Sequence, residues 1–437
     1  MDKQEKKFTK KEKSWIMYDW ANSVYATNVL AAIFPIYFGN VCSAAGADNV
    51  VLWSYGTSAA TFIIAILAPL LGAIGDHKGY KKKLFTGFMV VGVLFTLSCA
   101  FIENYKLLLV GYALSHIGFS GANLFYDSFL TDVTTDERMD RVSAWGYAMG
   151  YIGGSTIPFI GSIVVLVVMG MSNPASFKVV MIITSLWWLL FSIPFIKNVN
   201  QEHYIETDPS TLVRDSFKNL GTTAVSIFKI KGLLLFIIAY FLYIDGVNTV
   251  ISISTSYGST LGLNSIMMIL ALLVTQVVAV PCSIIFGKLS SKYGSINMLC
   301  FAVAMYILVV VVGFFMGFVI EQNPGDDSAL MKSQVLFWIL AFLVGTVQGG
   351  IQAISRSYFG KLIPSNKSNE YFGFFDIFGK FAAVIGPVLV AAAKQLTGRD
   401  SLSIVALAIL FVASLIILIV GKPHFKEAES TAKEALK

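Results

Sequence analysis

Two polar side chains interrupt the first long apolar segment of the chain. Asp19 and Asn22 lie in the stretch SWIMYDWANSVYATNVLAAIFPIYFG, which is otherwise apolar enough to cross a bilayer. Because a carboxylate is costly in hydrocarbon, an acid in such a segment usually faces a water-filled cavity or a partner. There it could accept a proton or hold the ammonium group of an amino acid. A neighbouring amide could orient a polar solute through both donors and acceptors.

The same pair returns in the second half of the chain. Asp19-Trp-Ala-Asn22 is echoed by Asp245-Gly-Val-Asn248 at an offset of 226 residues. One interpretation is that both carboxylates face a shared cavity and bind a solute or a proton. The other is that such Asp–Asn pairs cap backbone groups or bridge neighbouring helices. The residues alone leave both interpretations open.

Polar stripes mark two further apolar segments, since residues at i, i+3 or i+4 and i+7 share a helix face. One stripe carries Asn123 and Asp127, and the other carries Gln348, Gln352 and Arg356. An offset of 229 residues pairs Asn123 with Gln352 and Asp127 with Arg356. Opposite charges at equivalent places favour a bridge that opens and closes, so we predict a gate there.

Asp376 and Lys380 stand one helical turn apart in another apolar segment. An ion pair within one helix would make insertion cheaper. Alternatively, the lysine reaches the cavity and holds a carboxylate. The predicted solute- or proton-binding residues are Asp19, Asn22, Asn123, Asp245, Asn248, Gln348, Gln352 and Lys380.

The composition identifies the class of protein that must position these groups. Of 437 residues, 56% are hydrophobic and 13% charged, whereas soluble domains carry about 25% charged residues. Apolar segments long enough to span a bilayer as helices recur along the chain. We therefore predict an all-α membrane protein with twelve transmembrane segments, at about 15–39, 51–75, 84–102, 107–130, 143–169, 178–196, 232–257, 265–286, 297–320, 334–354, 371–393 and 401–421.

The basic residues predict the orientation. With the N-terminus inside, the cytoplasmic connections and tails hold 26 Lys and Arg residues and the outer connections hold 5. Such an imbalance places both termini in the cytoplasm. The charged start of the chain lacks the apolar core of a cleavable signal peptide. The basic inner loops also account for the net charge of +6 without a nucleic-acid partner.

Three repeats divide the chain into two homologous six-helix halves. Besides the Asp–Asn motif, GAIGDHKG aligns with GKLSSKYG at an offset of 215, and the stretch that ends at Pro158 aligns with the one that ends at Pro387 at 229. The predicted divisions are a tail at 1–14, halves at 15–196 and 232–421, a cytoplasmic loop at 197–231 and a second tail at 422–437.

Several chemistries have no motif in this sequence. It contains no GxxxxGK[ST] phosphate loop, no HExxH and no GxSxG, which argues against an ATP-driven pump and against a membrane-embedded enzyme. The four cysteines are scattered without zinc spacing. We expect no cofactor and no metal.

The two parallel halves resemble the major facilitator superfamily, whose solute sites lie near mid-membrane between the halves. Gly72-x3-Asp76-x2-Gly79-x-Lys81-Lys82 resembles its signature loop, although His77 stands where Arg or Lys is usual. The resemblance implies a gate in which Asp76 accepts hydrogen bonds from a helix N-terminus, with Arg141 as a partner. The predicted gating residues are Gly72, Asp76, Gly79, Lys81, Lys82, Asp127, Arg141, Gly287, Gly294, Arg356 and Asp376.

A narrower resemblance is carried by YDWANSVYA, DGVNTV, RVSAWGYAMGYIGG and QGGIQAISRSYFGKLIP. These stretches look like the vacuole-effluxer branch, which is named for fungal autophagy-related exporters of amino acids and has many bacterial members. The implied function is secondary transport of a small polar solute by alternating access. We expect amino acids as solute and protons as coupling ion, with sugars, small peptides or a non-transporting sensor as alternatives. The compact loops fit a monomer in a bacterial plasma membrane.

Overall fold

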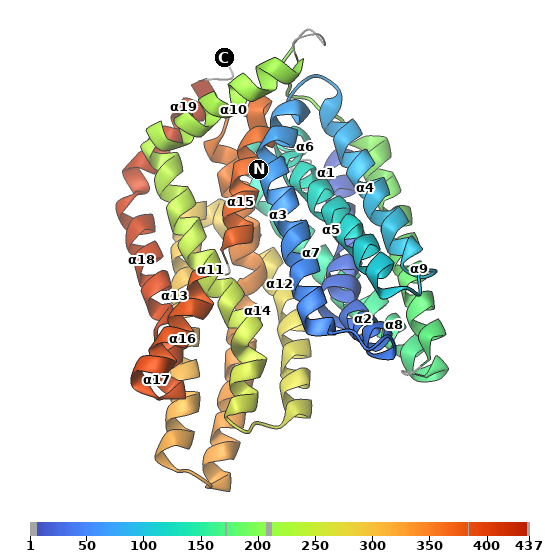
Figure 1. Cartoon of the computed structure of the whole chain (residues 1–437). Coiled ribbons are helices and arrows are strands. Elements are labelled where there is room, and N and C mark those ends of the chain that lie inside the picture. The colour runs from blue at the N-terminus through green and yellow to red at the C-terminus, as the bar shows by residue number, and fades with distance from the viewer. Residues whose placement is uncertain (1–6, 171–172, 207–211, 383, 435–437) are drawn as a thin grey trace. The chain divides into compact units, whose positions relative to one another are not determined.

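The computed structural model describes residues 7–170, 173–206, 212–382 and 384–434 (Figure 1). In these ranges the backbone is helical apart from loops, turns and one isolated parallel bridge between His77 and Ile205. The helices in chain order are α1 (Lys10–Tyr25), η1 (Ala26–Ala32), α2 (Ile33–Ala44), α3 (Asn49–Gly75), α4 (Tyr80–Ser98), α5 (Tyr105–Ser128), α6 (Leu130–Val133), α7 (Asp136–Gly150), η2 (Tyr151–Thr156), α8 (Ile157–Met169), α9 (Pro174–Asn198), α10 (Leu212–Lys229), α11 (Lys231–Thr260), α12 (Ser265–Tyr293), α13 (Ser295–Gln322), α14 (Asp327–Leu362), η3 (Ser365–Lys367), α15 (Ser368–Phe381), α16 (Ile385–Thr397), α17 (Asp400–Val405), α18 (Leu407–Val420) and α19 (Lys422–Glu434).

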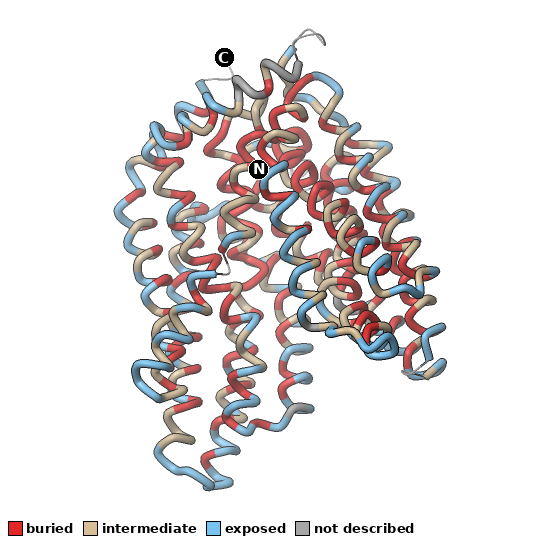
Figure 2. The backbone as a smooth tube through the Cα atoms, viewed as in Figure 1, coloured by how far each residue is buried: buried red, intermediate tan, exposed pale blue. Residues whose placement is uncertain are grey.

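Within these ranges, 11 helical stretches are long and apolar enough to cross a membrane. They correspond to eleven of the predicted segments, which confirms an all-α membrane fold. The remaining predicted segment, 84–102, corresponds to α4, which has three lysines near its start and is therefore less apolar. Large apolar side chains such as Val168 and Leu396 are exposed, and exposed stretches recur along the helices (Figure 2). Lipid can cover such surfaces without cost.

The chain forms two compact units. The first consists of Met1–Val142, Met149–Ala224 and Pro364–Ile377. In it α1 packs on α9, and α5 packs on both α3 and α4. Aromatic rings fill its interior, where the rings of Trp15 and Tyr126 stack 4.4 Å apart.

The second unit consists of Ser143–Ala148, Val225–Ile363 and Phe378–Lys437. In it α14 packs on α12 and α13, and α11 packs on α18. Its buried rings include the stacked pair Tyr306 and Phe411, with centroids 5.3 Å apart.

Two helices are irregular at equivalent places in the repeat. Between α7 and α8 the backbone passes through the π-helix η2, Tyr151–Thr156. The offset of 229 residues maps this range on 380–385, where α15 ends at Phe381 and α16 begins at Ile385. Backbone groups freed at a break inside a membrane must find partners within the protein. The side chains beside the second break supply them, as described below.

Candidate functional site

Asp76 caps the N-terminus of α15 from the loop between α3 and α4. Its Oδ1 accepts hydrogen bonds from the backbone N–H of Asn369 at 2.9 Å and from the Asn369 side chain at 2.8 Å. Its Oδ2 accepts the N–H of Glu370 at 3.0 Å. A Cβ at Gly72 would clash with the Asn369 carbonyl, so glycine permits this close approach. Asp76 thus accepts hydrogen bonds from a helix N-terminus, as expected. Its role in a gate stays a prediction.

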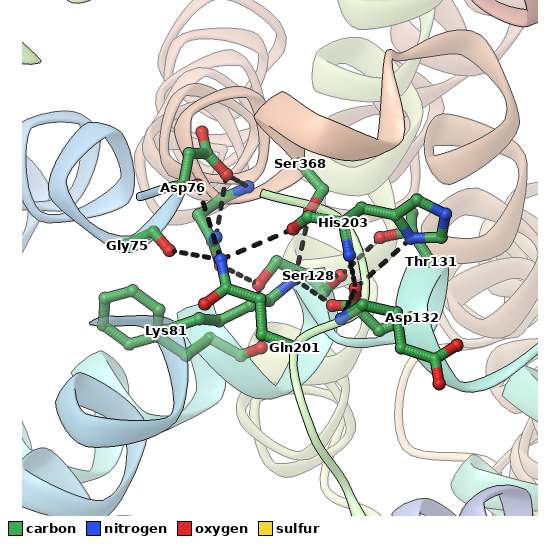
Figure 3. A network of polar contacts seen from close by, with 12 residues as sticks. Gly75, Asp76, Lys81, Ser128, Thr131, Asp132, Gln201, His203 and Ser368 are labelled. Atoms are coloured by element: carbon green, nitrogen blue, oxygen red, sulfur yellow. Dashed lines mark hydrogen bonds and ion pairs between the residues drawn. The ribbon is translucent and has the colours of Figure 1, made fainter. Parts of the chain in front are cut away.

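Lys81 lies beside this cap and is fully buried. Its ammonium lies 2.6 Å from Asp132 Oδ2 and donates to the Ser128 carbonyl and the Ser368 hydroxyl, both at 3.0 Å (Figure 3). All three donors of the ammonium are therefore used. Lys81 thus joins the end of α5, the helix α6 and the start of α15 within the first unit.

The segment after α9 is bonded to the same network. Asp132 Oδ1 accepts the backbone N–H groups of Glu202 at 2.9 Å and His203 at 2.8 Å. The Gln201 side chain donates to the Gly75 carbonyl at 3.0 Å, as Figure 3 also shows. The Lys81–Asp132 ion pair and the buried Asp76 therefore hold four parts of the chain together: the α3–α4 loop with the start of α4, the end of α5 with α6, the segment after α9, and the start of α15.

Two acids, Asp76 and Glu370, are buried together at the start of α15. Glu370 is fully buried, and among the described residues its carboxyl oxygens have no hydrogen-bond partner. Burial raises the pKa of Asp76 to about 8 and Glu370 adds to the rise, although Lys81 and the bonded N–H groups lower it. Burial also lowers the pKa of His77 in the same loop.

Arg141 does not take the place expected for it beside Asp76. Its guanidinium lies over the Phe8 ring, 4.6 Å from the centroid. The cation that lowers the pKa of Asp76 is Lys81, in the first turn of α4. The repeat pairs Arg141 with Glu370, and it is Glu370 that donates its N–H to Asp76. A gating role for Arg141 stays a prediction.

The remaining loop residues take different positions. Gly79 has a φ of 79° and begins α4, and Lys82 donates to the Asn200 side chain at 2.7 Å. In the second half, Gly294 has a φ of 87° between α12 and α13. Ser291 there donates to the carbonyl of Gly287 in its own helix at 3.2 Å, whereas Asp76 bonds another helix.

A second polar cluster lies between α1 and α5. Asp19 is half-buried, and its Oδ2 accepts the Tyr126 hydroxyl at 2.7 Å. The Asn22 side chain donates to Asn123 Oδ1 at 2.6 Å. The structure thus brings together three of the predicted binding residues. Tyr126 was not predicted, although it stands three residues after Asn123, on the same helix face.

Asp245 caps the helix that follows the break in the second unit. It is fully buried, and its oxygens accept the N–H groups of Ile385 at 2.9 Å and Gly386 at 2.8 Å. The Asn248 side chain donates to the Ala382 carbonyl on the other side of the break at 2.7 Å. This pair therefore satisfies backbone groups from both helix ends, as the helix-bridging interpretation expects.

The two predicted glutamines lie on α14. Gln348 is buried and Gln352 is half-buried. Arg356 on the same helix is buried, donates to the Ser143 hydroxyl at 3.0 Å, and lies 4.5 Å from the centroid of the Tyr147 ring. Solute binding by the glutamines stays a prediction.

The other predicted charges are half-buried. Asp127 lies on α5, and Asp376 and Lys380 lie on α15. The bridge from Asp127 to Arg356 and the roles of Asp376 and Lys380 stay predictions.

The helices are arranged as in several solved transporter structures. The chain matches FucP in its outward conformation with a TM-score of 0.66 at 15% identity, covering 94% of this chain and 98% of that one. It matches the proton:xylose symporter XylE with a TM-score of 0.65 at 11% identity, covering 93% of each chain. The fold is therefore that of a major facilitator superfamily transporter.

Sequence comparison identifies the family within this class of transporters. The family model described as "Vacuole effluxer Atg22 like" matches residues 8–136 and 130–426. The chain is 47% identical over 423 residues to the uncharacterized MFS-type transporter YxiO of Bacillus subtilis (strain 168), covering 94% of this chain and 95% of that one. It is 25% identical over 453 residues to autophagy-related protein 22 of Coccidioides immitis (strain RS), covering 84% and 71%. The chain belongs to the vacuole effluxer Atg22-like family.

Proposed function

We propose that this multi-pass transporter moves amino acids by alternating access, coupled to protons, in the direction of export. The observation that carries the proposal is the cluster of Asp19, Tyr126, Asn22 and Asn123 within two membrane-spanning helices. It offers a half-buried carboxylate for an ammonium group. Its amides and phenol offer donors and acceptors for the polar remainder of an amino acid. The effluxer name of the family supports export.

Within this proposal the two acidic motifs have different tasks. Asp19 is half-buried within a membrane-spanning helix and accepts the Tyr126 hydroxyl, and a partly accessible carboxylate there suits a group that binds a solute or a proton. Asp245 is fully buried and spends both oxygens on backbone N–H groups. We assign solute or proton binding to Asp19 and helix bridging to Asp245. Asn22 and Asn123 act with Asp19.

Counterflow in proteoliposomes tests the solute. The purified protein is reconstituted with unlabelled compound inside, and entry of the labelled compound is followed for amino acids, xylose, fucose and small peptides. We expect trans-stimulated exchange with amino acids. Exchange with sugars or peptides alone would contradict the amino-acid assignment, and a protein that exchanges none of them would contradict the transport proposal for these solutes.

Proton coupling is tested separately. Concentrative movement of a solute that passes the counterflow test should follow an imposed pH gradient and vanish with a protonophore, while counterflow itself continues. Concentrative movement that is insensitive to the protonophore would rule out the proton as coupling ion.

We also propose a plasma-membrane location with both termini in the cytoplasm, as a monomer built from halves at 15–196 and 232–421. The split of 26 to 5 basic residues supports this orientation. A single cysteine introduced at Lys332 should react with an impermeant maleimide from outside intact cells. A single cysteine introduced at Lys10 should react only when the cytoplasmic side is accessible. Labelling of the Lys10 position from outside intact cells would contradict the proposal.

A further inference from the structure

A pocket of about 780 Å³ opens at the signature loop of the first unit. Its wall is the first part of α4, with Lys82, Lys83, Gly87 and Val90. Asn200, Gln201 and Tyr204 line the opposite side. Among the described residues that line the pocket, three are lysines and none is acidic. The pocket therefore has a basic side and an apolar side.

The basic side carries positive charge that the protein does not neutralise. Lys78 pairs with Glu206 at 2.9 Å. Lys82 donates to the Asn200 amide oxygen, and Lys83 lies over the Tyr80 ring at 5.4 Å. Across the described residues, no carboxylate lies within ion-pair distance of either Lys82 or Lys83.

These two lysines lie in the first turn of α4, whose N-cap residue is Gly79. The helix dipole makes this end positive, so cations are unfavourable there and anions are favourable. Lysines without carboxylates at such an end imply that an anion from outside the protein offsets them.

The apolar side leads away from the lysines along α4. A Cβ at Gly87 would meet no described atom within 4 Å. Val90 is 38% exposed and Leu94, one turn further, is 56% exposed. The preceding membrane-spanning helix ends at Gly75, so the loop lies at the boundary of the hydrocarbon region. A ligand that spans both sides needs an anionic head and an apolar tail.

We propose that this pocket binds an anionic phospholipid. The phosphate lies between the ammonium groups of Lys82 and Lys83 at the start of α4, and one acyl chain runs over Gly87, Val90 and Leu94. Basic pockets at the inner surface of membranes are suited to such headgroups. The site is separate from the proposed solute cluster and does not depend on which solute is moved.

Native mass spectrometry of the delipidated full chain tests the proposal. Binding of phosphatidylglycerol and phosphatidylcholine is titrated in mixed micelles for the wild type and for Lys82→Gln/Lys83→Gln. Since each lysine near a membrane surface contributes about 1 kcal/mol to attraction of anionic lipid, the variant should bind phosphatidylglycerol roughly tenfold or more weakly. Phosphatidylcholine binding should not change.

The matched control is Lys288→Gln/Lys292→Gln, because these exposed lysines lie at the end of α12, in the stretch that aligns with the signature loop. It should bind phosphatidylglycerol like the wild type. Equal weakening in both double variants would show only general attraction and would overturn the site.

Gly87→Trp tests the apolar side without changing charge, since it projects into open space. It should also weaken phosphatidylglycerol binding, with an unchanged melting temperature. Wild-type binding by this variant would overturn the proposed path of the acyl chain. Displacement of the lipid by an equal concentration of inorganic phosphate would reassign the pocket as a site for free anions.

Discussion

Lys81 and Asp132 form an ion pair with no solvent exposure of either side chain. Every polar atom of the pair has a partner, since Asp132 also accepts two backbone N–H groups from the segment after α9. Taking two charges out of water is costly, so such a pair is stable only while both members are present. Losing one member is therefore worse than losing both.

The first prediction concerns this pair. Lys81→Met should destabilise the protein by about 3–5 kcal/mol, because it leaves a buried carboxylate without its cation. Lys81→Met/Asp132→Leu should recover much of the loss, but not the part that comes from the N–H groups of Glu202 and His203. Thermal unfolding in detergent measures both, with exposed Lys83→Met as control. A double variant less stable than the single one would contradict this account.

The second prediction is a pH dependence from Asp76. The pKa of Asp76 is raised to about 8 by burial, whereas an unfolded Asp has a pKa of about 3.9. The folded state therefore binds a proton that the unfolded state lacks, and stability is full below the lower value and declines as pH rises through the higher one. His77, whose pKa is lowered, stays neutral in the upper part of this range.

Melting temperatures between about pH 6 and about pH 9 check this prediction. The wild type should lose stability with rising pH, and Asp76→Asn should lose less because its side chain does not titrate. The same slope in both proteins would show that another group is responsible.

At the scale of elements, the break between α15 and α16 requires support from α11. In a bilayer, free N–H and C=O groups are satisfied only by protein. Asp245 binds the two amides at the start of α16, and Asn248 binds the carbonyl of Ala382. Thr249 donates to Asp245 at 3.3 Å and holds its carboxylate. The motif therefore fixes the place where the helix is interrupted.

The third prediction follows from this arrangement. Asp245→Ala should cost about 1–3 kcal/mol, because it leaves buried donors without an acceptor. Asp245→Asn retains one acceptor oxygen and should cost less. Hydrogen–deuterium exchange at Ile385 and Gly386 should accelerate in the alanine variant. Thr249→Ala, which keeps the carboxylate, is the matched control. Unchanged exchange at both amides in Asp245→Ala would contradict the capping role.

The sequence predicts most helices but not their interruptions. Segment 371–393 is predominantly apolar apart from Asp376 and Lys380, so length and composition predict one uninterrupted helix. Pro387, in the first turn of α16, is a signal for a helix start. The bond from Asp76 to a helix N-terminus was predictable because its loop follows a helix end. The ion pair of Asp132 was not predictable, because no sequence spacing links this residue to Lys81, which lies 51 residues away.

At the scale of the whole molecule, the same Asp–Asn motif occurs twice, 226 residues apart, in different surroundings. Asp19 is half-buried and accepts the Tyr126 hydroxyl, whereas Asp245 is fully buried and caps a helix end. The repeat predicts equal roles for the two acids, and the local packing makes them unequal. The proposed transport function rests on Asp19, Asn22, Asn123 and Tyr126, so the acid at Asp19 is the place to test it.

The most direct test is the current on a solid-supported membrane after a jump in amino-acid concentration. Wild type, Asp19→Asn and Asp48→Asn are reconstituted in equal amounts; Asp48 caps α3 and is distant in sequence, and asparagine caps a helix equally well. The account predicts currents in the wild type and in Asp48→Asn, and a loss of current in Asp19→Asn at unchanged melting temperature. Wild-type currents in Asp19→Asn would contradict a role for this carboxylate in transport.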